Sequence, residues 1–122
     1  MNYMNSVCKL IRFYCSNERL RLLGDVKYHL GNRNLIHVQL EGKEHPLHLS
    51  LSANPSHLEA VNGVVIGKTK AKQFYIQDHQ RKKVMPILIH GDAAFSGQGI
   101  VPEALELSNL AEYDVGGAFR ML

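Results

Sequence analysis

Apolar and polar residues alternate in two neighbouring stretches of the chain, residues 35–40 and 47–51. The alternating apolar positions are Ile36, Val38, Leu40, Leu47, Leu49 and Leu51. A period of two is the spacing of a strand that buries one face. The pattern therefore predicts a β-hairpin whose two strands are joined through residues 41–46.

The pattern after residue 53 is typical of a helix. Ser56-His57-Leu58-Glu59 fits a capping box, and Pro55 suits the first helical turn. We expect a helix from this point to Tyr75, with Asn62-Gly63 as the place where it would break. A spacing of 3.6 residues at positions 7–14 predicts a further short amphipathic helix.

A nearly continuous apolar run, VMPILIHGD, covers residues 84–92. Such a run suits a strand buried on both faces of a parallel sheet. We expect a loop of small residues after it, helical spacing from residue 100 and another strand in VGGAFRML. This β-α-β order predicts an α/β fold with part of a parallel sheet. Ligands bind at the carboxyl ends of such strands, where Asp92 lies.

Composition narrows the class of protein. The 122 residues suffice for one domain, and no apolar run is long enough for a membrane span. The net charge is +3, and the only basic cluster is Arg81-Lys82-Lys83, so we expect neither nucleic acid nor a membrane among the partners. Cys8 and Cys15 form no CxxC or zinc spacing, which favours a reduced, intracellular protein.

Each candidate for chemistry has a plain structural alternative. Asp92 could bind Mg²⁺ together with ligand phosphates, or could cap the following turn. Ser56 could contact an anionic ligand at a helix start, or only cap that helix. Three histidines in loops or at element ends could bind an anion or transfer protons, or could be ordinary surface or buried residues: His29, His57 and His90.

Five motifs occur in order along the chain: GDVKYHLG (24–31), SLSANPSHLEAV (50–61), GKTKAKQ (67–73), ILIHGDAAFSGQGIVPEALELSNL (87–110) and YDVGG (113–117). Together they closely resemble the E1 component of the 2-oxoglutarate dehydrogenase complex, a thiamine-diphosphate-dependent decarboxylase and dehydrogenase. The likeness extends over residues 24–117, and GDVKYHLG with NPSHLEAV is highly specific to that family.

The resemblance implies roles for four residues. His29 is similar to the family histidine that contacts 2-oxoglutarate, and we treat it as both a catalytic and a substrate-binding candidate. Ser56 matches a serine that contacts the same substrate. Leu58 matches a residue that lines the thiamine diphosphate site, and Asp92 matches the aspartate that binds the Mg²⁺ bridging the cofactor's diphosphate. The cofactor would supply the carbon chemistry, so the protein would mainly position the cofactor and tune its reactivity.

The chain also departs from the family pattern. The family usually has Asp-Pro where this chain has Asn62-Gly63, and residues 1–23 do not resemble the family segment that precedes GDVKYHLG. The chain has neither the family's HRGR motif nor the NNQ segment that completes its metal site. We therefore expect a divergent segment over residues 1–23, followed by part of the first thiamine-diphosphate-binding domain over 24–122, with the β-hairpin as an insertion.

The expected function is that of a piece of a 2-oxoglutarate dehydrogenase E1, inactive alone. In the family, E1 oxidatively decarboxylates 2-oxoglutarate and transfers succinyl to a lipoyl group of the E2 component, and it works beside a second E1 chain. The alternative is a non-enzymatic interaction protein that binds full-length E1 or E2, while a metal-dependent hydrolase lacks the residues that would activate water. The expected compartment is the cytoplasm in a bacterium or the mitochondrial matrix in a eukaryote.

Overall fold

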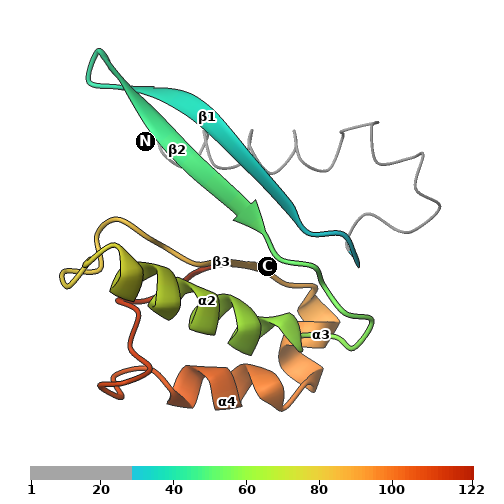
Figure 1. Cartoon of the computed structure of the whole chain (residues 1–122). Helices are drawn as coiled ribbons and strands as arrows, with labels where there is room; N and C mark the ends of the chain where they lie inside the picture. Colours follow the sequence, from blue (N-terminus) through green and yellow to red (C-terminus); the bar gives the residue numbers. More distant parts are fainter. Residues whose placement is uncertain (1–28) are drawn as a thin grey trace.

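The computed structural model describes residues 29–122. Its elements run in the order β1 (Asn32–Leu40), β2 (Lys43–Leu51), α2 (Val61–Tyr75), β3 (Ile87–Ile89), α3 (Asp92–Gly97), α4 (Ile100–Glu106) and β4 (Phe119–Met121) (Figure 1). The helix predicted at 7–14 and the segment 1–23 lie outside the described residues. In the described part, no helix is both long and apolar enough to cross a membrane.

The predicted hairpin is present, and its connection is shorter than expected. Strands β1 and β2 pair antiparallel, and Leu40 lies opposite Lys43 across the turn. The turn residues Glu41 and Gly42 have φ angles of 51° and 77°, the left-handed pair that a tight hairpin turn requires. The prediction of a loop over 41–46 is wrong because Pro46, which indicated a loop, is tolerated in a strand that pairs along one edge only.

Helix α2 ends at Tyr75 as predicted but begins at Val61, with its N-cap at Ala60, four residues later than the capping box implies. Its N-cap, Ala60, makes no side-chain hydrogen bond. Glu59 has a φ of 66°, and this left-handed backbone prevents the helix from extending back to Ser56. The capping-box prediction is therefore wrong, and the helix continues unbroken through Asn62 and Gly63.

Strands β3 and β4 form the predicted parallel pair, with Ile87 opposite Phe119. Leu88 is buried, but Ile89 is exposed, so the expected burial on both faces is wrong. The reason is that the sheet contains only these two strands within residues 29–122. The residues after Asp92 form α3 rather than a loop, since Ala93 and Ala94 favour helix and the Phe95 amide bonds the Gly91 carbonyl at 2.9 Å.

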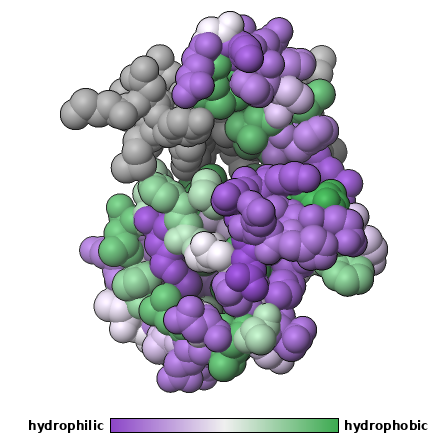
Figure 2. Space-filling view, turned by 90° about the vertical axis from the view of Figure 1, so that its left-hand side faces the viewer, coloured by the Kyte–Doolittle hydropathy of each residue, from purple (hydrophilic) through white to green (hydrophobic). Residues whose placement is uncertain are grey.

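A small core joins α2, α4 and the loop before β4. Ile66, Ala104 and Val115 form its buried apolar cluster. Helix α2 lies between the hairpin and α4 in Figure 1, with β3 behind it. The face drawn in Figure 2 mixes hydrophobic with hydrophilic residues instead of gathering the hydrophobic ones into one patch. The fold is thus mixed α/β with two small sheets.

Polar side chains hold the loops that lead into the parallel strands. Gln73 of α2 is buried, and its Nε2 donates to the carbonyls of Val84, at 3.0 Å, and Val115, at 2.9 Å. One residue therefore fixes both the segment before β3 and the segment before β4. These contacts hold the chain where it enters the amino ends of the two strands, and the candidate site lies at their carboxyl ends.

The carboxylate of Asp78 organises the loop between α2 and β3. Burial raises the pKa of Asp78, but hydrogen bonds from the backbone N–H groups of Lys83, Lys82 and Val84, with the nearby charge of Lys83, outweigh it and hold the pKa below its ordinary value of 3.8. The donor distances are 2.7 Å from Lys83, 3.0 Å from Lys82 and 3.2 Å from Val84. The ionised carboxylate thus fixes the chain that enters β3.

Candidate functional site

Asp92 lies where β3 ends and α3 begins, as the sequence predicted. Its side chain is exposed, and Oδ1 accepts a hydrogen bond from the backbone N–H of Ala93 at 2.8 Å. Oδ2 accepts no hydrogen bond from residues 29–122, so one carboxylate oxygen faces solvent. No group of three or more metal-binding side chains occurs in this range. The donor set therefore does not suit a cation held by protein ligands alone.

A buried network of polar side chains includes His90, two residues before Asp92. His90 Nδ1 is 2.7 Å from Glu59 Oε2, and Asn62 Nδ2 donates to the same oxygen at 2.9 Å. His90 Nε2 is 3.3 Å from Arg120 Nη1 in β4. The network thus links the segment before α2, the end of β3 and β4.

The donors and acceptors fix the proton on the His90 ring. A guanidinium only donates hydrogen bonds, so Nε2 accepts from Arg120, and Nδ1 carries the proton that bonds the Glu59 carboxylate. Arg120 and Glu59 then carry opposite charges at the two ends of a neutral imidazole. Each buried polar atom in this chain of contacts has a partner, which is the condition for burying charge without a large penalty.

Leu58 and Ser56 lie in the segment that Glu59 ties to His90. Both are exposed, with Leu58 at 57% of its full accessible surface. Ser56 caps no helix, because α2 begins at Val61, so the structural alternative of Ser56 as a cap is wrong. The contact between Glu59 and His90 brings the chain around Leu58 and the chain around Asp92 to the same edge of the sheet.

His29 lies beside the same segment. Its Nδ1 is 2.5 Å from the backbone carbonyl of Asn54, and a carbonyl only accepts, so Nδ1 is the donor. Asn54 precedes Ser56 by two residues. The structure therefore brings His29 to the segment that carries Ser56 and Leu58.

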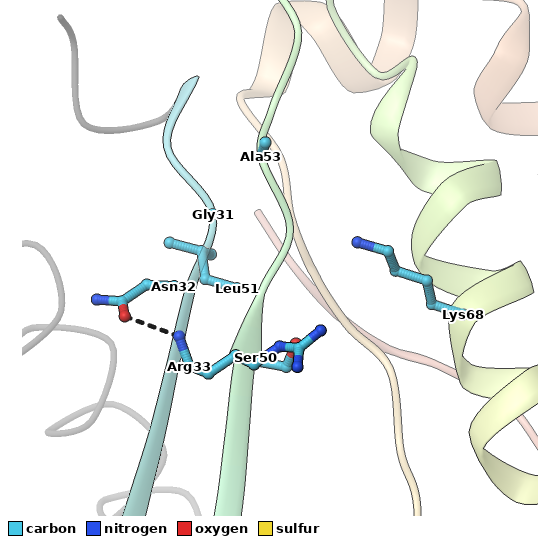
Figure 3. A pocket seen from close by; sticks show the side chains of 7 residues that line it. All are labelled: Gly31, Asn32, Arg33, Ser50, Leu51, Ala53 and Lys68. Carbon is cyan, nitrogen blue, oxygen red and sulfur yellow. Dashed lines mark hydrogen bonds between the residues drawn. The ribbon is translucent and has the colours of Figure 1, made fainter. Parts of the chain in front are cut away.

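A separate pocket of about 350 Å³ lies between the hairpin and α2. Figure 3 shows Lys68 extending from α2 toward the strands, with Arg33 on the hairpin side. None of the four predicted site residues lines it. His57 is exposed and has no bond to the network within the described residues.

Sequence reasoning missed three members of the network. The local pattern places Glu59 only in a capping box, and it assigns neither Asn62 nor Arg120 to a site. The one available signal was His90, which follows a buried strand immediately before Gly-Asp. The partners of its ring, Glu59 and Arg120, are 31 and 30 positions away, and no local pattern connects them.

Comparison with known proteins gives a consistent result. Residues 5–119 match the family described as Dehydrogenase E1 component. The chain is 56% identical over 105 residues to the 2-oxoglutarate dehydrogenase E1 component of Rickettsia conorii, covering 86% of this chain and 11% of that protein.

Two eukaryotic relatives are similarly close. The mitochondrial 2-oxoglutarate dehydrogenase of Dictyostelium discoideum is 54% identical over 99 residues, and the mitochondrial 2-oxoglutarate dehydrogenase-like protein of Pongo abelii is 55% identical over 100 residues. Each alignment covers 81% of this chain and 10% of the relative. The chain thus spans about a tenth of the length of these relatives.

Proposed function

We propose, since this chain belongs to the dehydrogenase E1 component family, that it forms part of the cofactor and substrate site of a 2-oxoglutarate dehydrogenase E1. The observation that carries the proposal is the exposed Asp92 carboxylate at the carboxyl end of a parallel strand. The names of the bacterial and mitochondrial relatives support the assignment.

The residues of the site fit Mg²⁺ held jointly with a diphosphate. Mg²⁺ is commonly bound through one or two carboxylates, with phosphate oxygens and waters completing its six ligands. Asp92 supplies one such carboxylate with an oxygen open to solvent, and residues 29–122 offer no cage of protein ligands that would exclude a phosphate. Asp92 would hold the metal, and Leu58 would lie against the apolar part of thiamine diphosphate.

Thiamine diphosphate, when bound, supplies the carbanion stabilisation that decarboxylation of a 2-oxoacid needs. The residues of this chain would bind and orient the cofactor and the substrate. Ser56 and His29 would contact the carboxylates of 2-oxoglutarate. The Ser56 hydroxyl can donate a hydrogen bond to a carboxylate, and His29, whose Nδ1 proton bonds the Asn54 carbonyl, would donate from Nε2 in the protonated form, in which both ring nitrogens are donors. The bond from His29 to the Asn54 carbonyl fixes the orientation of the ring relative to the Ser56 segment. Transfer of the succinyl group to a lipoyl group of E2, and pairing with a second E1 chain, belong to the same proposal.

The test is calorimetric titration of the purified chain with thiamine diphosphate, with and without Mg²⁺. We expect binding that depends on Mg²⁺ and weakens at least roughly tenfold in Asp92→Asn, because the amide cannot replace a charged ligand. Glu106→Gln is the matched control, since it makes the same chemical change on an exposed carboxylate of α4. Equal affinity in wild type and Asp92→Asn would refute the role of Asp92.

A second candidate is a non-enzymatic protein that binds full-length E1 or E2. The observation that favours it is exposed apolar surface, above all Phe74 and Tyr75 at the end of α2, which are 70% and 81% exposed. Immobilised chain should then retain purified E1 or E2, and Phe74→Ser with Tyr75→Ser should abolish retention. Failure to retain either subunit would exclude this candidate.

A further inference from the structure

The contact between Glu59 and His90 joins the two segments of the proposed cofactor site. Both side chains are almost wholly buried, and the two residues are 31 positions apart in sequence. Leu58 directly precedes Glu59, and Asp92 follows His90 by two residues. The pair is therefore buried, whereas Leu58 and Asp92 are exposed. Glu59 is next to Leu58 in the sequence, and His90 is two residues from Asp92.

The backbone at position 59 indicates that the glutamate side chain itself is needed there. A φ of 66° is strained for glutamate and unstrained for glycine. Position 59 nevertheless carries a carboxylate, which accepts hydrogen bonds from both His90 and Asn62. Buried ionic groups are weak contributors to net stability compared with apolar residues, so stability alone does not account for this choice.

His90 is held from four directions. Its ring bonds Glu59 and Arg120, and its backbone N–H donates to the Met121 carbonyl of β4 at 2.8 Å. The ring also packs edge to face on Phe95 of α3, with centroids 5.0 Å apart. Because Phe95 lies three residues after Asp92, the short segment that carries Asp92 is anchored on both sides.

We propose that Glu59 and His90 are positioning residues that hold the Asp92 carboxylate in register with the Leu58 segment. The inference rests on the proposed function for its ligand, Mg²⁺ with thiamine diphosphate. Neither residue touches that ligand. Glu59 orients the His90 ring, the ring and the β4 contact fix the backbone at Gly91, and the backbone aims Asp92. Partners of this kind, outside the metal ligands, typically affect metal affinity by roughly 10- to 100-fold.

The experiment compares Glu59→Leu, which removes the acceptor, with Glu59→Gln, which keeps an oxygen that can accept from His90. Glu106→Gln is again the matched exposed control. By calorimetry with Mg²⁺ and thiamine diphosphate, we expect Glu59→Leu to weaken binding roughly 10- to 100-fold. Glu59→Gln should recover most of this loss. If Glu59 only filled space, Glu59→Leu would not weaken binding more than Glu59→Gln, because leucine and glutamine fill similar space. Equal loss in Glu59→Gln and Glu59→Leu, or no loss in either, would overturn the proposal.

A second measurement separates this inference from the proposed function. Amide hydrogen exchange without any ligand should be faster for Ala93–Ser96 in Glu59→Leu than in wild type, with the central amides of α2 unchanged. If wild type binds no thiamine diphosphate, the proposed function fails, and exchange alone decides the positioning role. Unchanged exchange at Ala93–Ser96 would overturn that role whatever the cofactor result. Acceleration spread equally over α2 would also overturn it, because the effect would then be global unfolding.

Discussion

Replacing Gln73 with methionine tests whether one buried amide holds the two loops that enter the parallel strands. Methionine has nearly the same length and volume and lacks the donor, so the carbonyls of Val84 and Val115 lose their partner. Each buried carbonyl left without a donor costs roughly 1–3 kcal/mol. The wild-type Oε1 is itself buried with no partner in residues 29–122, and its removal offsets one such cost. The net expectation is a loss of about 1–3 kcal/mol in the free energy of unfolding.

The assay is reversible urea unfolding followed by far-UV circular dichroism. Gln77→Met is the matched control, because Gln77 is exposed and its side-chain amide bonds only the Phe74 carbonyl and the exposed His79 ring, so its effect should stay within about 0.5 kcal/mol. We also expect faster amide exchange in residues 82–84 and 113–117 of Gln73→Met. A Gln73→Met variant as stable as wild type would refute the reasoning, since the two carbonyls would then have other partners.

Further predictions concern charge and backbone conformation. Because folding lowers the pKa of Asp78, the stability that its carboxylate contributes is present above the unfolded pKa of about 3.8 and is lost as the pH falls through the lower folded value. The stability difference between wild type and Asp78→Asn in urea should therefore be largest near neutral pH and shrink below pH 4, and a difference that is constant with pH would contradict this. Gly116→Ala should lower the thermal midpoint and cost about 1–3 kcal/mol, because φ is 81° and a Cβ would lie 2.8 Å from the Cβ of Arg81. Gly67→Ala in α2 should instead add about 0.5–1 kcal/mol, since the space around it is open, and a lower midpoint there would contradict the helical assignment.

The parts of the fold that sequence predicted well are those set by local pattern. The alternation of apolar and polar residues predicted the hairpin, and an apolar run that ends in Gly-Asp predicted β3 and the position of Asp92 at its end. Ser56 to Glu59 satisfied a local helix-start rule and still did not start a helix. The Glu59 carboxylate bonds His90, 31 positions away, and its backbone is left-handed. No local rule contains that information.

The sequence did not indicate the buried contacts of Gln73, which holds two loops, or of Arg120, which belongs to the site, and the physical reason is the same for both. A glutamine on a helix and an arginine on a short strand read as solvent-exposed positions, because their partners are remote in sequence. Gln73 is 4% exposed since two loops bring carbonyls to it, and Arg120 reaches His90 only after the parallel strands pair. Roles for His29, Ser56, Leu58 and Asp92 came from the family motifs, and their contacts with ligand stay predictions.

The parallel pairing of β3 and β4 also orders the assembly of the molecule in time. The hairpin closes across two residues, and such contacts form within roughly 1–10 μs. Ile87 must wait for Phe119, 32 positions later, and closing so long a loop delays the contact. Until β4 arrives, the His90 amide lacks its Met121 acceptor and the ring lacks Arg120. On a chain growing from its N-terminus, the hairpin is therefore an early structure. The contacts of His90 that hold the segment around Asp92 are among the last to form.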